Sequence, residues 1–187
     1  MNSKLSTITS DNIILRPLTK ADLENRVRWF NDLQVRQTLV VNEVFELEKT
    51  IRWFERMQSD KTRTEFAIET PEGVVIGVTG LLGIENEHGV AECYCVIGNK
   101  DYWGKKLGTE IHSVLIQWAF EKLGLYKIRA DIRTNNPAIF RVVEKLGFKI
   151  EGTLRKEKVV DGQRIDLYRI GLLREEFTST HKIFKIK

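Results

Sequence analysis

The 187-residue chain predicts a mixed α/β domain in which antiparallel strands come first and alternating strands and helices follow. Three short apolar runs, residues 65–69, 74–82 and 90–97, are separated by turn residues, which is typical of an antiparallel meander. A strand, a helix and a strand then follow one another, which implies one parallel pair joined by a right-handed crossover. Near the end, Asp161-Gly162 between two strand-like runs predicts a hairpin.

The N-terminal part predicts one strand and two helices before the meander. Residues 13–15 form an apolar run typical of a strand. Thr19 is suited to cap a helix that begins at Lys20, and a second helix is expected over residues 46–58, because apolar residues recur in both at helical spacing. Pro71-Glu72-Gly73 supplies the first turn of the meander.

The second half alternates helices and strands. A helix is expected over residues 105–123, with Gly124 as its C-terminal stop, and a strand over residues 127–133. The next helix, residues 137–146, has Asn136 as its cap, Pro at its first position and Gly beyond its end. Two final strands flank the predicted hairpin turn, over residues 155–160 and 164–172.

Length and composition indicate a single domain over residues 1–187, with a core at 10–177 and a basic tail at 178–187. The net charge of +4 permits an anionic ligand, but the acidic residues are interspersed with the basic ones, which argues against a nucleic-acid partner. No signal-peptide run and no apolar stretch of roughly 20 residues is present, so a cytoplasmic protein without a membrane partner is expected. Cys93 and Cys95 are expected to pack rather than to bind a metal, since no second pair exists.

The loop before the helix at 105–123 is the first candidate site. It reads Trp103-Gly104-Lys105-Lys106-Leu107-Gly108-Thr109. Glycines let the backbone approach a ligand, and the unpaired amides of a helix N-terminus suit a phosphate or pyrophosphate. Two lysines at that end are unfavourable for the helix itself, and a bound anion explains them. The alternative is a glycine-containing loop with solvated lysines.

Two segments carry a resemblance to a known family. Asn136-Pro137-Ala138, followed by the run from Arg141 to Phe148, resembles the second cofactor motif of GNAT acetyltransferases, and the run from Trp103 to Glu110 resembles their pyrophosphate loop. The spacing of the two, together with Leu15-Arg16-Pro17-Leu18, resembles the RimJ/RimL-type branch. The resemblance covers residues 13–177. It implies a sheet of about seven strands with one splayed parallel pair, flanked by about four helices.

The same resemblance implies acetyl-CoA as co-substrate, no metal, and an amine acceptor that is a small molecule or a peptide; it allows a homodimer. CoA is expected in a V-shaped opening between the strands at 90–97 and 127–133. The backbone of Val96 and Ile97 is expected to contact the pantetheine arm, and the amides from Lys105 to Thr109 to receive the pyrophosphate. Asn136 and Phe140 are expected near the thiol end and the arm. The alternative for Asn136 is a helix cap alone, and the two roles are compatible.

Two departures from the family pattern concern the loop and the general acid. Lys106 stands where the superfamily usually has a glycine, so one amide is expected to be less accessible. Val143 stands where many members have a tyrosine as general acid, and Ile139 where the branch often has a serine. Proton return to the CoA thiolate must then come from another group or from water. A thiol pKa of about 8.5 makes a dedicated acid dispensable.

Acetyl transfer needs a neutral amine, so a base must remove its proton. Glu92 is the candidate, as a lone carboxylate in an apolar run; the alternative is a solvent-facing strand residue. Tyr94 lies on the same face by alternation, where it is suited to position substrate or relay a proton. A cysteine acyl-enzyme is a weaker alternative.

The acceptor pocket is expected to involve the first two helices, with Trp29, Phe30 and Asn31 as candidates; core packing is the other reading for the aromatic residues. The three histidines, His88, His112 and His181, are read as surface residues. The favoured function is acetyl-CoA-dependent N-acetylation of a primary amine by direct transfer. The alternatives are a non-catalytic acyl-CoA-binding domain and, from the charged tail alone, a nucleic-acid-binding module.

Overall fold

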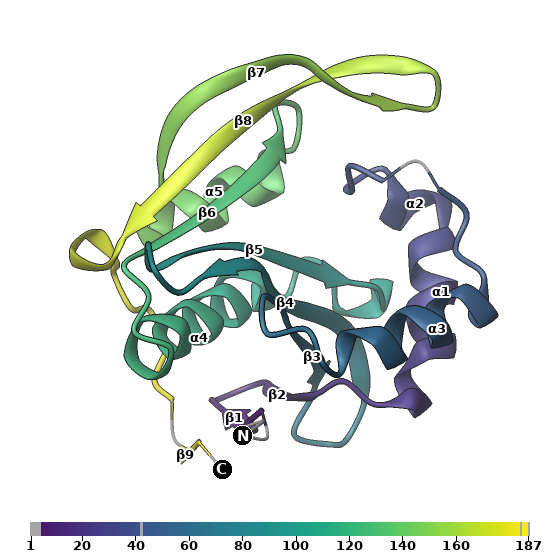
Figure 1. Ribbon diagram of the computed structural model, residues 1–187, viewed down its shortest axis with the longest axis horizontal. Coiled ribbons are helices and arrows are strands. Elements are labelled where there is room, and N and C mark those ends of the chain that lie inside the picture. Colours follow the sequence, from purple (N-terminus) through teal and green to yellow (C-terminus); the bar gives the residue numbers. More distant parts are fainter. Residues whose placement is uncertain (1–4, 42, 184, 187) are drawn as a thin grey trace.

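A computed structural model describes residues 5–41, 43–183 and 185–186; Phe184 and Lys187 of the predicted tail lie outside them. The strands of the described chain form one sheet in the order β7-β8-β6-β5-β4-β3-β2-β1-β9 (Figure 1). Their bounds are β1 Ile8–Thr9, β2 Ile14–Pro17, β3 Thr64–Glu69, β4 Val75–Glu85, β5 Val90–Ile97, β6 Lys127–Arg133, β7 Lys149–Val160, β8 Gln163–Leu173 and β9 Lys185–Ile186. The expected mixed α/β class with one parallel pair is confirmed.

The described sheet has nine strands, so the expectation of seven was wrong. The two additional strands, β1 and β9, have two residues each, too few to produce a periodic signal. They pair with each other, Ile8 opposite Ile186 and Thr9 opposite Lys185. The end of the basic tail therefore returns to the N-terminal strand.

Five α-helices are present in the described chain, one more than expected: α1 Leu23–Asn31, α2 Leu33–Arg36, α3 Leu47–Met57, α4 Leu107–Lys122 and α5 Pro137–Leu146. The additional helix, α2, is a single turn capped by Asp32, whose carboxylate accepts hydrogen bonds from the amides of Gln34 and Val35. The helix expected from Lys20 begins as a 3₁₀ turn before α1. No described helix is long and apolar enough to cross a membrane.

The two faces of the sheet bury separate apolar cores. On one face α4 packs through Ile111, Leu115 and Trp118, and the Trp118 ring meets Phe66 of β3 edge to face at 5.3 Å. On the other face α1 and α3 cover Val78 and the neighbouring strands. Figure 1 shows α4 on one side of the sheet and α1 to α3 together at the opposite end. Any side chain on β5 therefore faces either α4 or the α1–α3 group.

The parallel pair of β5 and β6 separates part-way along its length. Val90, Ala91 and Glu92 are opposite Lys127, Ile128 and Arg129, and within these fully described strands the pairing goes no further. Beyond Glu92 the two strands diverge, as the resemblance implied. Beside them, the long β7–β8 hairpin arches away from the body of the domain (Figure 1).

Candidate active site

A cavity of about 1260 Å³ opens where β5 and β6 diverge and extends toward α1 and α3. Most of the predicted site residues line it: Phe30, Glu92, Tyr94, Val96, Ile97, Trp103, Gly104, Lys106, Leu107, Gly108, Thr109 and Asn136. Two groups of residues that are far apart in sequence thus meet in one space. The part near α4 and α5 is called the cofactor side below, and the part near α1, α3 and β3 the acceptor side.

Four predicted site residues lie elsewhere. The Phe140 ring packs against Tyr168 with centroids 5.6 Å apart, away from the cavity. Trp29 is buried against the backbone of Gly98, in agreement with the core reading. Asn31 accepts from the amide of Phe45 and donates to its carbonyl, at 2.9 and 2.7 Å, so its role is to hold the α2–α3 segment. The Lys105 ammonium lies 4.3 Å from the centre of the Tyr102 ring.

The loop before α4 has the backbone geometry expected of an anion site. Gly104 and Lys106 both have positive φ, +76° and +63°, and α4 begins only at Leu107 because Lys106 is left-handed. The side chain of Trp103 fixes the loop by donating to the Ile97 carbonyl at 2.8 Å. Lys106 thus has the conformation that a glycine would take, at a cost of roughly 1–2 kcal/mol. Among the first amides of α4, that of Thr109 donates to the Lys106 carbonyl at 3.3 Å, and those of Leu107 and Gly108 are the ones suited to a pyrophosphate.

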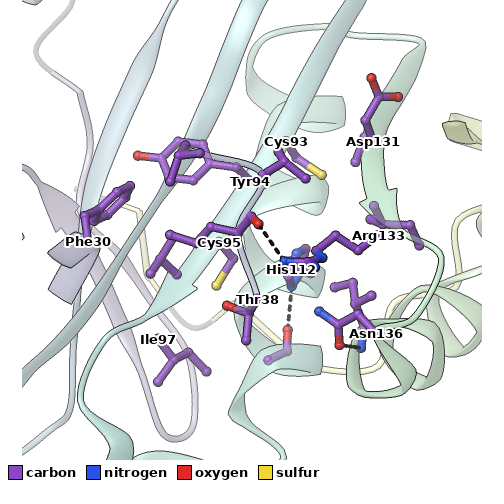
Figure 2. A pocket seen from close by; sticks show the side chains of 18 of the residues that line it. Phe30, Thr38, Cys93, Tyr94, Cys95, Ile97, His112, Asp131, Arg133 and Asn136 are labelled. Carbon is purple, nitrogen blue, oxygen red and sulfur yellow. Dashed lines mark hydrogen bonds between the residues drawn. The ribbon is translucent and has the colours of Figure 1, made fainter. Parts of the chain in front are cut away.

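Asn136 forms the opposite wall of the cofactor side. Its Oδ1 accepts from the Ile139 amide at 3.3 Å, which confirms the helix cap (Figure 2). It also lines the cavity, so the second role proposed for it stays a prediction. Arg133, at the end of β6, reaches across the opening and donates to the carbonyls of Gln37 and Leu39, at 2.9 and 3.4 Å. Nothing in the local sequence pattern indicates this link.

Glu92 occupies the point where the two strands diverge. Its side chain is half-buried and lines the cavity, which differs from the solvent-facing alternative. In the described chain its carboxylate has neither a hydrogen bond nor an ion pair. Burial raises the pKa of Glu92 above its ordinary value, the charge of Asp131 adds to the rise, and Arg129 and Arg169 oppose it. A carboxylate with a raised pKa and free oxygens is well suited to accept a proton.

Tyr94 is engaged on the acceptor side. Figure 2 shows its ring directed toward Phe30, away from Asp131 and Arg133. The hydroxyl donates to the carboxylate of Glu65 in β3, across Gly80, which lies opposite both residues in register. Glu65 is only 4% exposed, and burial raises its pKa to about 6. Sequence reasoning missed Glu65 because the partners are 29 positions apart.

Comparisons with known proteins agree with this geometry. The acetyltransferase (GNAT) domain family matches residues 12–149. The uncharacterized N-acetyltransferase p20 of Bacillus licheniformis is 27% identical and aligns with 92% of this chain and 99% of its own. Spermidine N(1)-acetyltransferase of Escherichia coli K12 is 25% identical over 93% of this chain and 92% of its own. The crystal structure of spermidine N-acetyltransferase from Vibrio cholerae with CoA and spermine superposes with a TM-score of 0.84 at 22% identity, covering 88% and 96% of the two chains.

The chain belongs to the GNAT acetyltransferase family. It is an N-acetyltransferase, and acetyl-CoA is its acetyl donor. The comparisons bring out relatives of the spermidine N-acetyltransferase type and do not show the expected RimJ/RimL branch.

Within this GNAT fold the two cysteines are packing residues. Both face α4, and neither forms a disulfide. Burial raises the pKa of each thiol to about 12. A thiol that holds its proton so strongly is a poor nucleophile, which argues against an acyl-enzyme. No group of three His, Cys, Asp or Glu side chains in the described residues is placed to hold a metal ion.

His112 contradicts the surface reading of the histidines. It is buried in α4 and lines the cofactor side, whereas His88 is exposed and His181 is half-buried. Its Nδ1 is 2.7 Å from the Gly108 carbonyl, so Nδ1 carries the hydrogen and burial lowers the pKa of the ring. The bare Nε2 is then an acceptor, so neutral His112 is not a replacement for the missing general acid. The prediction failed because α4 is apolar on nearly all sides, and spacing cannot single out one buried polar residue.

Proposed function

We propose that the acetyl group moves directly from acetyl-CoA to a primary amine while both are bound, with Glu92 as the base. The amine nitrogen forms a bond to the thioester carbonyl carbon, and the carbon–sulfur bond breaks to release the CoA thiolate. Glu92 accepts the proton that the nitrogen loses, directly or through one water. The observation that carries this proposal is the free, half-buried Glu92 carboxylate at the point where β5 and β6 diverge.

The surrounding groups support this assignment. Beyond Glu92 the edge of β5 that faces β6 has no partner strand, so its backbone near Val96 and Ile97 is available to an extended pantetheine arm, apart from the Ile97 carbonyl, which accepts from Trp103. Tyr94 is two residues from Glu92 on the same face, but its hydroxyl already donates to Glu65. Its role is therefore to shape the acceptor side rather than to relay the proton.

Proton return to the thiolate uses solvent. Ile139 and Val143 line the cofactor side with apolar side chains, where a hydroxyl is common in the family. A thiol with a pKa of about 8.5 is a good leaving group at neutral pH, so a water molecule is sufficient to protonate it.

The acceptor is a primary amine, the chemical class on which the spermidine N-acetyltransferase relatives act by name. The test is release of free CoA thiol with a panel of polyamines, amino sugars, amino acids and short peptides. Glu92→Gln is expected to lower kcat by about 10²- to 10⁴-fold, because it removes the base, while the dissociation constant for CoA stays within twofold.

Glu87→Gln, an exposed carboxylate in the β4–β5 turn, is the matched control and is expected to retain full activity. Full turnover by the Glu92 variant would contradict the assignment of the base. Tight CoA binding without acetylation of any amine would instead favour the non-catalytic reading, for which the apolar Val143 position is the supporting feature.

A further inference from the structure

The acceptor side contains an arginine held among three aromatic rings. Arg26 projects from α1, and its guanidinium carbon is 4.2 Å from the ring centre of Trp53, 4.4 Å from Phe30 and 5.5 Å from Phe45. All four side chains line the cavity. Stacking of this kind fixes a guanidinium plane without using any of its N–H donors.

Those donors have no acceptor in the described part of the chain. The Nε of Arg26 is buried without a hydrogen-bond partner, and the guanidinium forms no ion pair. The nearby acids are engaged or exposed. Glu65 accepts from Tyr94 and has Arg63 at 3.7 Å, and Glu46 is 2.6 Å from Lys49. A half-buried guanidinium whose donors lack acceptors destabilises the protein unless a ligand accepts their hydrogen bonds.

The charges of this region do not balance. Both Arg26 and Arg63 act electrostatically on the single carboxylate of Glu65. One positive charge on this wall therefore has no protein counter-charge close by; Glu43, the remaining acid on this side, is exposed. A second ammonium group at this point of an acceptor would be repelled, and an anion would be attracted.

We propose that the acceptor amine carries a carboxylate, which Arg26 binds while the amine lies at Glu92. The inference rests on the proposed function, since Glu92 places the amine. Tyr94 separates the two ends, and two residues of strand span roughly 7 Å, so several bonds must separate amine and carboxylate. Such a carboxylate can belong to a free ω-amino acid or to the side chain of a glutamate at a peptide N-terminus.

The first experiment uses three amines of equal length that differ only at the far end: 5-aminopentanoate, pentylamine and 1,5-diaminopentane. The expected order of kcat/KM is carboxylate, then methyl, then ammonium, with roughly tenfold between the first two, since a charge-assisted hydrogen bond contributes about that much. Equal use of the three, or preference for the diamine, overturns the inference. Glu-Ala-Ala and Gln-Ala-Ala peptides then distinguish the peptide source from the free ω-amino acid.

Variants of Arg26 assign the effect to this residue. Arg26→Gln is expected to lower kcat/KM for 5-aminopentanoate by about 10- to 100-fold and to leave pentylamine within twofold. Arg26→Lys, which keeps the charge, is expected to retain part of the preference. Arg28→Gln, two positions along α1 and outside the cavity, is the matched control and should change neither value. An equal loss for both amines would mean that Arg26 has only a structural role.

A binding measurement separates this inference from the proposed function. Calorimetry of pentanoate with the CoA-saturated protein should show binding by the wild type and by Arg28→Gln, and binding at least tenfold weaker for Arg26→Gln. Pentanoate binding without acetylation of any amine would sink the proposed function and leave the anion site in place. Acetylation of amines without pentanoate binding and without a charge preference would support the proposed function and overturn the anion site at Arg26.

Discussion

The two sides of the cavity are made of different parts of the chain. The cofactor side presents mainly backbone: the free edge of β5 and the left-handed turn that opens α4. The acceptor side presents side chains, namely the aromatic rings around Arg26 and the pair of Tyr94 with Glu65. Backbone can be disturbed only through conformation, whereas side chains can be exchanged one at a time. On this scaffold the backbone is suited to bind the acetyl donor, and exchangeable side chains are suited to bind the acceptor.

The largest effect is expected from a change that moves backbone on the cofactor side. Gly77 of β4 lies opposite Ile97, and a Cβ added there would stand 2.2 Å from the Val96 carbonyl oxygen. Gly77→Ala must displace the β5 edge, which costs about 3 kcal/mol of unfolding free energy by the scale of overpacked cores. The affinity for CoA should also fall at least tenfold. Urea unfolding measures the loss of stability, and calorimetry measures the loss of affinity.

Gly152→Ala is the control for Gly77, because nothing lies within 4 Å of its added Cβ. It should leave CoA binding unchanged. Unaltered CoA affinity in Gly77→Ala would show that the β5 edge is not part of the cofactor side. The cofactor side would then not be distinguished by its backbone.

The cofactor side was predictable from sequence to the extent that its signals are local. β5, β6 and α5 have the predicted bounds because alternation, a cap at Asn136 and a stop at Gly147 are short-range features. The loop before α4 was located by its glycines in the same way. In this loop the conformation of Lys106 was not predicted, because a lysine gives no indication of a left-handed backbone. The burial of His112 on the same side and the position of Phe140 outside the cavity were not predicted either.

The acceptor side was mostly not predictable, because it depends on long-range contacts. The Tyr94 to Glu65 bond joins residues 29 apart, and the Arg133 link joins residues about 95 apart. Of the three residues predicted there, only Phe30 lines the cavity, since periodicity marks an apolar face without saying what it packs against. The missed strands β1 and β9 have the same cause, because pairing alone defines them.

An intermediate effect is expected from Glu65, and it depends on pH. The pKa of Glu65 rises from an ordinary 4.5 to about 6 on folding. The unfolded chain therefore loses this proton first, and the stability of the native state falls by about 2 kcal/mol as pH rises through 4.5 to 6. Glu65→Gln cannot ionise, so its unfolding free energy relative to the wild type should rise by about 2 kcal/mol between pH 4 and pH 7.

Denaturant unfolding at pH 4, 5, 6 and 7 measures this difference, with Glu48→Gln, an exposed carboxylate on α3, as the control. A difference that is flat with pH would mean that Glu65 is solvated in the native state. The buried hydrogen bond between Tyr94 and Glu65 would then not be part of the acceptor side.

The smallest effect separates backbone from charge within the cofactor side. Lys106→Gly relieves the left-handed strain and should raise the unfolding free energy by about 1 kcal/mol, whereas Lys106→Ala removes the same charge and keeps the strain. If amides rather than the ammonium hold the pyrophosphate, both variants should bind CoA within about fivefold of the wild type, since an exposed charge near a helix terminus contributes only about 0.3–1 kcal/mol. Calorimetry and urea unfolding of the two variants side by side give both quantities. A loss of more than tenfold in both would assign the pyrophosphate to the lysine side chain, and the cofactor side would then depend on side chains as the acceptor side does.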